Sequence, residues 1–189
     1  MTKAEALEIL EELKNSPNMV KHGLACGFAM SALYDYFSKE NKKPELDKTS
    51  WEISGLLHDA DYEITGKSVE LHTEETTKKL EEVGAAKEII EAVRGHADKS
   101  PRNTLMAKSV YAADELTGLI VAAALVQPNK KLKSVAVDSV LRKFKDKSFA
   151  AGANRDQIKT CETELNIPLE EFTSIILKAM QGDSEELGL

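Results

Sequence analysis

The sequence predicts an all-α fold. Three observations support this: apolar residues recur at spacings of three and four along most of the 189 residues, no stretch alternates apolar and polar residues as a half-buried strand would, and the five prolines are spread widely. Proline is unfavourable inside a helix and tolerated at its first turn, so these positions mark boundaries between helices. We therefore expect a bundle of helices connected by loops.

The first half of the chain is expected to hold five helices. Asp47 or Thr49 can cap the third of them, and Gly84 is a natural stop for the fourth. Gly23 and Gly27 lie four residues apart on the second helix, so they share a face on which another helix can approach closely. The expected ranges are 3–14, 19–38, a third helix ending at about residue 59, 73–83 and 85–94, with a loop over 60–71.

A strongly apolar stretch in the second half predicts a buried central helix over 104–126. Beyond it, seven Lys and Arg residues outnumber two Asp residues over 129–147, so this stretch carries +5 while the rest of the chain carries −12. Later helices are expected to begin at Asn154 or Arg155 and to cover 168–181. We expect a helical domain at 1–126 and a C-terminal helical extension at 127–189, packed on the same core.

Composition limits the function. A formal charge of −7 argues against binding to a nucleic-acid polymer or to an anionic membrane surface. The two cysteines, Cys26 and Cys161, form no CxxC motif, which indicates a reducing compartment and a core-filling role for Cys26. The acidic N-terminus is unlike a secretory signal, and no apolar run is long enough to cross a bilayer. We therefore expect a cytoplasmic protein.

The chemistry centres on the His58-Asp59 pair, which ends an apolar run. Neighbouring side chains on an α-helix point about 100° apart, so the two can hold one ion from different sides while Asp59 keeps a second oxygen for another ion. Imidazole and carboxylate together suit divalent transition metals. Alternatively, the pair marks a helix that turns polar as it reaches the surface.

The other histidines and one aspartate favour the metal-binding interpretation. The chain has four histidines, each expected on a helix or at its end, and none lies beyond residue 96. Asp114 lies among apolar residues of the expected central helix, where a carboxylate is costly to bury unless it is paired or bound to metal. Simpler interpretations exist for His22 as a helix-start residue, His72 as a solvated surface residue and His96 as a helix C-cap whose imidazolium meets the helix dipole.

Together these residues resemble the pattern of the HD-domain superfamily of metal-dependent phosphohydrolases: a His on an early helix, a His-Asp pair ending a later one, and an Asp on a long apolar helix. Gly95-His96-Ala97-Asp98 and Asp114-Glu115-Leu116 are similar to a branch of small, uncharacterised members. The resemblance covers residues 20–125 and implies an HD-domain helical bundle. It implies a first metal held by His22, His58, Asp59 and Asp114, and a second held by Asp59, His72 and His96, with Asp59 bridging the ions.

The resemblance implies a metal-dependent phosphohydrolase that acts on a small phosphate ester or nucleotide through a metal-activated hydroxide. A ligand set without thiolate favours one or two divalent ions among Mn, Fe, Zn, Ni, Co and Mg over a structural Cys-zinc site. Two alternatives stay open. Some two-metal relatives, such as inositol oxygenase, are di-iron oxygenases, and a non-catalytic domain could hold a structural metal. The sequence determines neither the substrate nor the oligomeric state.

Two carboxylates just past the pair are candidates for catalysis alongside Asp59. Asp61 and Glu63 could act as proton acceptors or could orient a metal ligand. They stand where other family members continue with Ile-Gly-Lys, so a lysine contact found there is missing here.

Four basic residues are candidates for binding the substrate phosphate. Lys21 and Arg94 flank expected ligands in the sequence. Arg142 and Lys143 could contribute if the basic stretch at 129–147 folds over the site. Ordinary exposed charge is the alternative for all four, and a solvated helical face is the alternative for the basic stretch.

Overall fold

The all-α prediction is confirmed. The computed structural model describes residues 1–189 and contains ten α-helices, one short 3₁₀ helix and no strand. The helices are α1 (Lys3–Glu12), α2 (Pro17–Lys39), α3 (Lys48–Leu57), α4 (Glu74–Glu82), α5 (Lys87–His96), α6 (Leu105–Leu125), α7 (Val137–Lys145), α8 (Arg155–Thr163), α9 (Leu169–Gly182) and α10 (Ser184–Leu187), with the 3₁₀ helix at Leu132–Ser134.

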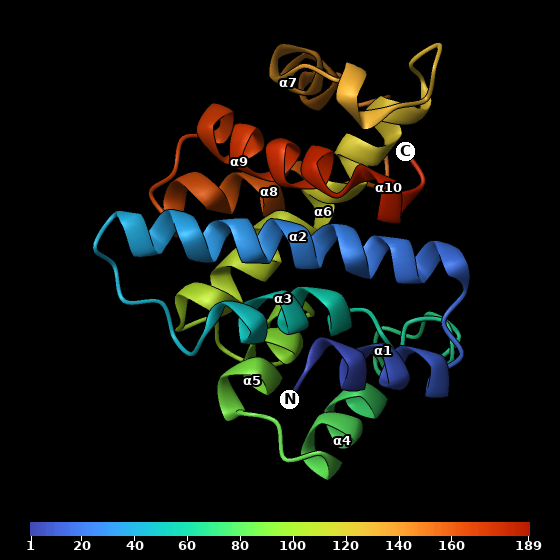
Figure 1. Cartoon of the computed structure of the whole chain (residues 1–189), viewed down its shortest axis with the longest axis vertical. Coiled ribbons are helices and arrows are strands. Elements are labelled where there is room, and N and C mark those ends of the chain that lie inside the picture. Colours follow the sequence, from blue (N-terminus) through green and yellow to red (C-terminus); the bar gives the residue numbers. More distant parts are fainter.

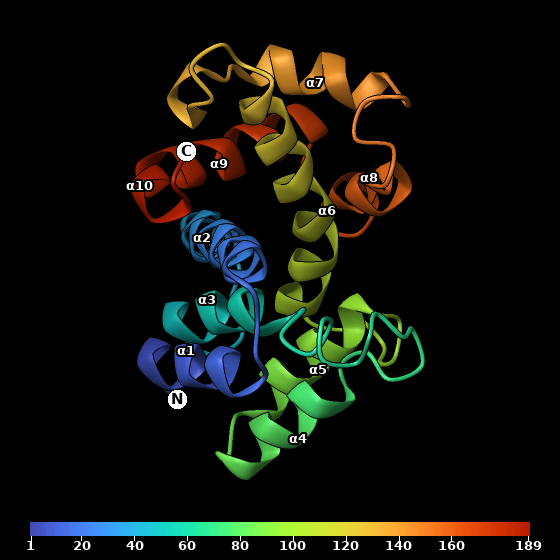
Figure 2. The ribbon, with the colours of Figure 1, turned by 90° about the vertical axis from the view of Figure 1, so that its right-hand side faces the viewer.

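Two long helices organise the bundle. Figure 1 shows α2 crossing the molecule, with α3 beside it on one side and α9 on the other. Figure 2 shows α6 running from the end of the molecule that holds α5 to the end that holds α7. Helix α6 packs against α2, α5, α7 and α8, so it is the central helix that the apolar pattern predicted.

Side-chain caps define where several helices begin. Asp47 accepts a hydrogen bond from the Ser50 amide at 2.8 Å, and Thr104 accepts one from the Ala107 amide at 3.0 Å. Asn154 caps α8 in the same way. A capping side chain satisfies backbone N–H groups that have no partner within the helix.

Glycines bring α2 and α3 into backbone contact. A Cβ atom added at Gly23 would lie 2.5 Å from the Leu56 carbonyl oxygen, and one added at Gly55 would lie 2.7 Å from the Cys26 carbonyl group. The two helices can therefore pack this closely only without side chains at these positions. This contact sets the distance between His22 on α2 and His58 at the end of α3.

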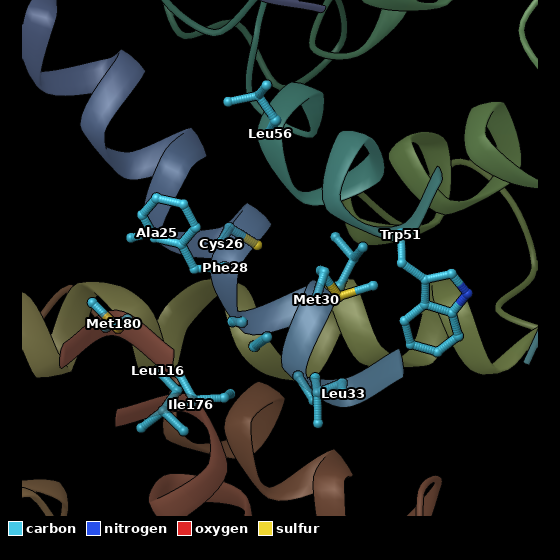
Figure 3. Packing of buried hydrophobic residues seen from close by; sticks show 14 of the residues in the cluster. Ala25, Cys26, Phe28, Met30, Leu33, Trp51, Leu56, Leu116, Ile176 and Met180 are labelled. Carbon is cyan, nitrogen blue, oxygen red and sulfur yellow. The ribbon is translucent and has the colours of Figure 1, made fainter. Parts of the chain in front are cut away.

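A continuous cluster of buried apolar side chains extends from Ala6 to Leu187. Figure 3 shows part of it, with Met30 and Leu33 of α2 and, beside one another, Leu116 of α6 and Ile176 of α9. Cys26 is buried within it, as expected. The core therefore includes side chains from both 1–126 and 127–189. The division of the chain at residue 126 stays a prediction.

Some boundaries differ from the expected ones. Helix α5 continues through Gly95 to His96, two residues beyond the expected end. The basic stretch divides into the 3₁₀ helix and α7, and the single turn of α10 has no counterpart among the expected helices. The structure contains no helix with the length and apolar character needed to cross a bilayer.

Candidate metal centre

His58 occupies the C-cap position of α3 and is completely buried. Its Nδ1 atom lies 2.7 Å from the Gly55 carbonyl oxygen. Because a carbonyl can only accept a hydrogen bond, Nδ1 carries the proton and Nε2 remains available as a donor of electrons. His96 at the end of α5 has the same arrangement, with Nδ1 against the Val93 carbonyl oxygen. The helix ends therefore fix both imidazoles.

Three side chains, from His22, Asp59 and Asp114, converge on His58 and form a group of four donors with it. Its Nε2 atom lies 3.1 Å from Nε2 of His22 and 3.2 Å from Oδ1 of Asp114. The His22 Nε2 atom lies 3.1 Å from Oδ1 of Asp114 and 3.4 Å from Oδ2 of Asp59. These four ligand atoms all lie within 4.8 Å of one another.

A second group of three donors lies next to the first. Nε2 of His72 and Nε2 of His96 are 2.9 Å apart. Oδ1 of Asp59 lies 3.1 Å from the former and 3.2 Å from the latter. His72 reaches the group from the end of the turns that join α3 to α4, and His96 from the end of α5.

Asp59 belongs to both groups, with one oxygen in each. Its Oδ1 atom faces His72 and His96, and its Oδ2 atom faces His22 and His58. The structure thus brings together the six residues that the sequence placed at a metal site, in the two groups expected. Their role as metal ligands stays a prediction.

The spacing of the donors fits metal ions. An ion about 2.1 Å from each ligand holds neighbouring ligand atoms about 3.0 Å apart in an octahedron and about 3.4 Å apart in a tetrahedron. The close donor pairs in the two groups are separated by 2.9 to 3.6 Å. The donors are nitrogen and oxygen without sulfur, which suits Mn, Fe, Co, Ni, Zn or Mg. One or two divalent ions are therefore compatible with these residues.

The side chains of the two donor groups shift one another's pKa values. Burial acts to lower the pKa of His22, but hydrogen bonds to Asp114 and Asp59 outweigh it and raise the pKa to about 10. Burial acts in the same direction on His72, where Asp59 and Asp61 raise the pKa to about 9. Burial acts to raise the pKa of Asp114, but the charges of His58 and His22 and their hydrogen bonds hold it well below its usual range. Without a metal ion His22 and His72 therefore pair with the carboxylates as imidazolium groups.

Asp61 supports the second group from behind. Its side chain is completely buried, and Oδ1 accepts hydrogen bonds from Nδ1 of His72 at 2.9 Å and from the Thr73 amide at 2.8 Å. Its Oδ2 atom accepts from the amides of Glu75 and Thr76 in the first turn of α4. Asp61 therefore orients His72 and caps α4. Of the two roles expected for Asp61, this geometry fits orientation of a ligand, because no oxygen is left for a substrate proton.

Thr73, between His72 and α4, has an unusual backbone. Its φ angle of 69° lies in the left-handed region, where a β-branched residue is strained. The hydrogen bond from its amide to Asp61 holds this conformation. The strained turn directs His72 toward His96.

Lys99 is a supporting residue that the sequence did not indicate. Its ammonium group donates to the backbone oxygens of Glu70 and His72 and to the Glu74 carboxylate. These bonds tie the segment that carries His72 to the turn after α5. A lysine that binds mainly backbone oxygens leaves no local signal in the sequence. Only the position of Lys99, three residues after His96, could have suggested its supporting role.

The structure places three other expected residues outside the two donor groups. Glu63 accepts a hydrogen bond from the Ser16 amide at 2.6 Å, at the N-terminus of α2, and its catalytic role stays a prediction. Arg94 pairs through Nη1 with the Glu74 carboxylate at 3.2 Å. Lys21 lies one residue before His22 on α2 and is exposed.

The basic residues of α7 also lie apart from the donors. Helix α7 packs against α6 and α9, and Figure 2 shows it at the end of the molecule opposite α4. Lys143 lies over the Phe149 ring at 4.2 Å, and Arg142 is exposed. The expectation that this stretch folds over the site with Arg142 and Lys143 is therefore wrong, because α7 covers the far end of α6.

Glu115 is a further carboxyl group near the centre, next to Asp114 on α6. Burial and the charge of Asp114 raise its pKa above the ordinary value for Glu. It is half-buried and belongs to neither donor group.

The comparison with known families agrees with this arrangement. The family model described as HD domain matches residues 5–119, a range that contains all six donors. No curated protein and no solved structure matches the chain.

Proposed function

Because the chain belongs to the HD-domain family, we propose that it is a metal-dependent phosphohydrolase acting on a small phosphate ester. The observation that carries this proposal is the division of the Asp59 carboxylate between two groups of donors. The six donor residues would hold one or two divalent ions, whose chemistry, when bound, would be to polarise a phosphoryl oxygen and to activate a water.

The residues of the chain would then hold and orient the reactants. The reaction consumes one water, breaks one P–O bond, and releases an alcohol and inorganic phosphate. His58 and His96, fixed by backbone carbonyls, keep the donor geometry constant. The Lys21 ammonium group, on the exposed side of His22, can pair with a phosphate oxygen.

The proposal is tested with the metal-loaded full chain and a panel of phosphate monoesters, with released phosphate as the measurement. We expect Mn, Fe, Co, Ni, Zn or Mg to stimulate release, and Asp59→Ala to lower it at least about 100-fold because both groups lose a donor. Asp138→Ala replaces an exposed aspartate on α7 and should retain full activity.

Other outcomes would point to the alternative functions. Oxygen consumption by the iron-loaded protein without phosphate release would identify an oxygenase. A metal that only raised the melting temperature, with no ester hydrolysed, would indicate a structural role.

A further inference from the structure

A pocket lies beside the metal centre, between the start of α2, the second half of α6 and α10. Its volume is about 440 Å³, within the range of small-molecule sites. Figure 2 shows α10 close to α2, on the same side of α6. The apolar lining of the pocket comes from α6 and from the C-terminal segment: Val121, Leu125, Leu187 and Leu189.

The pocket adjoins the open side of the centre. The His22 side chain lines the pocket and is 26% exposed, whereas His58 is 0% and His96 is 4% exposed. Solvent therefore reaches the first donor group past His22. A ligand bound at the centre would extend from there into the pocket.

Gly118 keeps this space open. It lies one turn after Asp114 on α6, it lines the pocket, and a Cβ atom added there would meet no heavy atom within 4 Å. Glycine weakens a helix interior relative to alanine. Unlike Gly23 and Gly55, Gly118 makes no close helix contact that would explain it, so the free volume beside Asp114 is what this glycine provides.

The chemistry of the pocket favours an aliphatic ligand. Four of its lining residues are aliphatic, and its one ring is the His22 imidazole, which belongs to the first donor group, so the pocket offers no Phe, Tyr or Trp ring on which a nucleobase could stack. Lys21 and Asn18 supply polar groups on the side of α2. An aliphatic chain would gain from burial against the leucines and valine, while its charged end stayed beside His22 and Lys21.

We propose that this pocket binds the alkyl part of an aliphatic phosphate monoester whose phosphate lies at the metal centre; this rests on the proposed phosphohydrolase function. Five of the nine lining residues lie beyond the family match, which ends at residue 119. The segment that follows the family domain, through Leu187 and Leu189, would thus determine which leaving group the shared centre accepts.

The test uses the metal-loaded full chain and two phosphonates, whose P–C bond is not hydrolysed. Binding of methylphosphonate and hexylphosphonate is measured by calorimetry. Each buried methylene strengthens binding about fourfold, so we expect hexylphosphonate to bind at least about tenfold more tightly. Gly118→Leu should fill the pocket and reduce this preference to less than about twofold.

Gly182→Leu is the matched control. Gly182 also lies on a helix and faces open space, but it does not line the pocket, so this variant should keep the preference. Leu125→Gln replaces an apolar lining residue at an exposed position. It should weaken the binding of hexylphosphonate and leave the binding of methylphosphonate unchanged. Circular dichroism checks that each variant folds, and Leu125→Gln decides the outcome if Gly118→Leu does not.

The outcomes distinguish the proposal about the pocket from the proposed phosphohydrolase function. Equal binding of the two phosphonates, a preference that survives Gly118→Leu, or tighter binding of adenosine monophosphate than of hexylphosphonate would overturn the proposal. A preference for hexylphosphonate without hydrolysis of any phosphate ester would support the pocket and overturn the phosphohydrolase function. Hydrolysis of phosphate esters at a rate independent of the length of their alkyl chain would support the phosphohydrolase function and overturn the pocket proposal.

Discussion

The Asp61 carboxylate lies 2.9 Å from Nδ1 of His72, on the side of the imidazole that faces away from Asp59. The same carboxylate accepts hydrogen bonds from three backbone amides at the start of α4. One buried residue thus couples the direction of His72 to the position of a helix. A histidine held in this way keeps one tautomer and one orientation.

Asp61→Asn should weaken the second donor group. One carboxylate oxygen becomes an NH₂ group that faces backbone N–H donors, so we expect a loss of stability of about 1–3 kcal/mol. Metal affinity at the second group should fall about 10–100-fold. Thermal unfolding and metal titration measure the two effects, with Asp138→Asn as the exposed control. Unchanged affinity would show that His72 needs no orienting partner.

His72→Ala should reduce the number of bound ions from two to one. His72 contributes to one group only, and the first group keeps all four of its donors. Metal analysis of the purified variant gives the count directly. Asp59→Ala, which removes a donor from both groups, should bind both ions more weakly. A count of two in His72→Ala would mean that the second ion lies elsewhere.

Metal binding should release protons and strengthen as the pH rises. The pKa values of His22 and His72, about 10 and about 9, mean that both imidazoles carry protons near pH 7 when no ion is bound. An ion must displace these protons. Calorimetry in buffers of different ionisation enthalpy should therefore show a buffer-dependent heat. A heat independent of buffer would contradict protonated imidazoles.

The stability of the metal-free protein should depend on pH in the opposite direction. Both imidazoles have folded-state pKa values above the ordinary value of about 6.5, so the folded state binds their protons more tightly than the unfolded chain. This contribution is complete below about pH 6.5 and is lost as the pH rises through about 9 to 10. Melting temperatures of chelator-treated protein from pH 6 to 10 should fall accordingly. A melting temperature that stayed constant or rose with pH would refute the pairing of these imidazolium groups with the carboxylates.

Gly55→Ala should destabilise the contact between α2 and α3. The new methyl group would lie 2.7 Å from the Cys26 carbonyl group, so the helices must separate, at a cost of about 1–3 kcal/mol. Gly118→Ala is the matched control, because it adds the same atom to a helix in open space and should be neutral or stabilising. Denaturant unfolding compares the two. Equal stability would mean that the helices tolerate separation.

The sequence was informative where the signal is local. Apolar spacing gave the long helices, and the caps at Asp47 and Asn154 follow from residue type. The six donors were found because histidine is rare in this chain and because the His-Asp pair resembles a known family. These signals depend on neighbours within one helix turn or on a short motif.

The supporting contacts could not be predicted in this way. Asp61 caps a helix that begins 13 residues later, and Glu63 binds an amide 47 residues earlier. Arg94 meets Glu74 on another helix. Such pairs depend on the three-dimensional packing of helices, which a single sequence does not specify. The position of α7 at the far end of α6 was missed for the same reason.

The carbonyl groups of Gly55 and Val93 fix two of the imidazoles through backbone that belongs to finished helices. The helix bundle itself therefore positions these imidazoles, and a metal ion would bind to a site that is already formed. The identity of the bound metal would depend on which metals the cell supplies. The affinity of a nitrogen and oxygen site for these metals follows their intrinsic order of affinity more than the particular protein. The same polypeptide could then carry different metals in cells grown under different metal regimes.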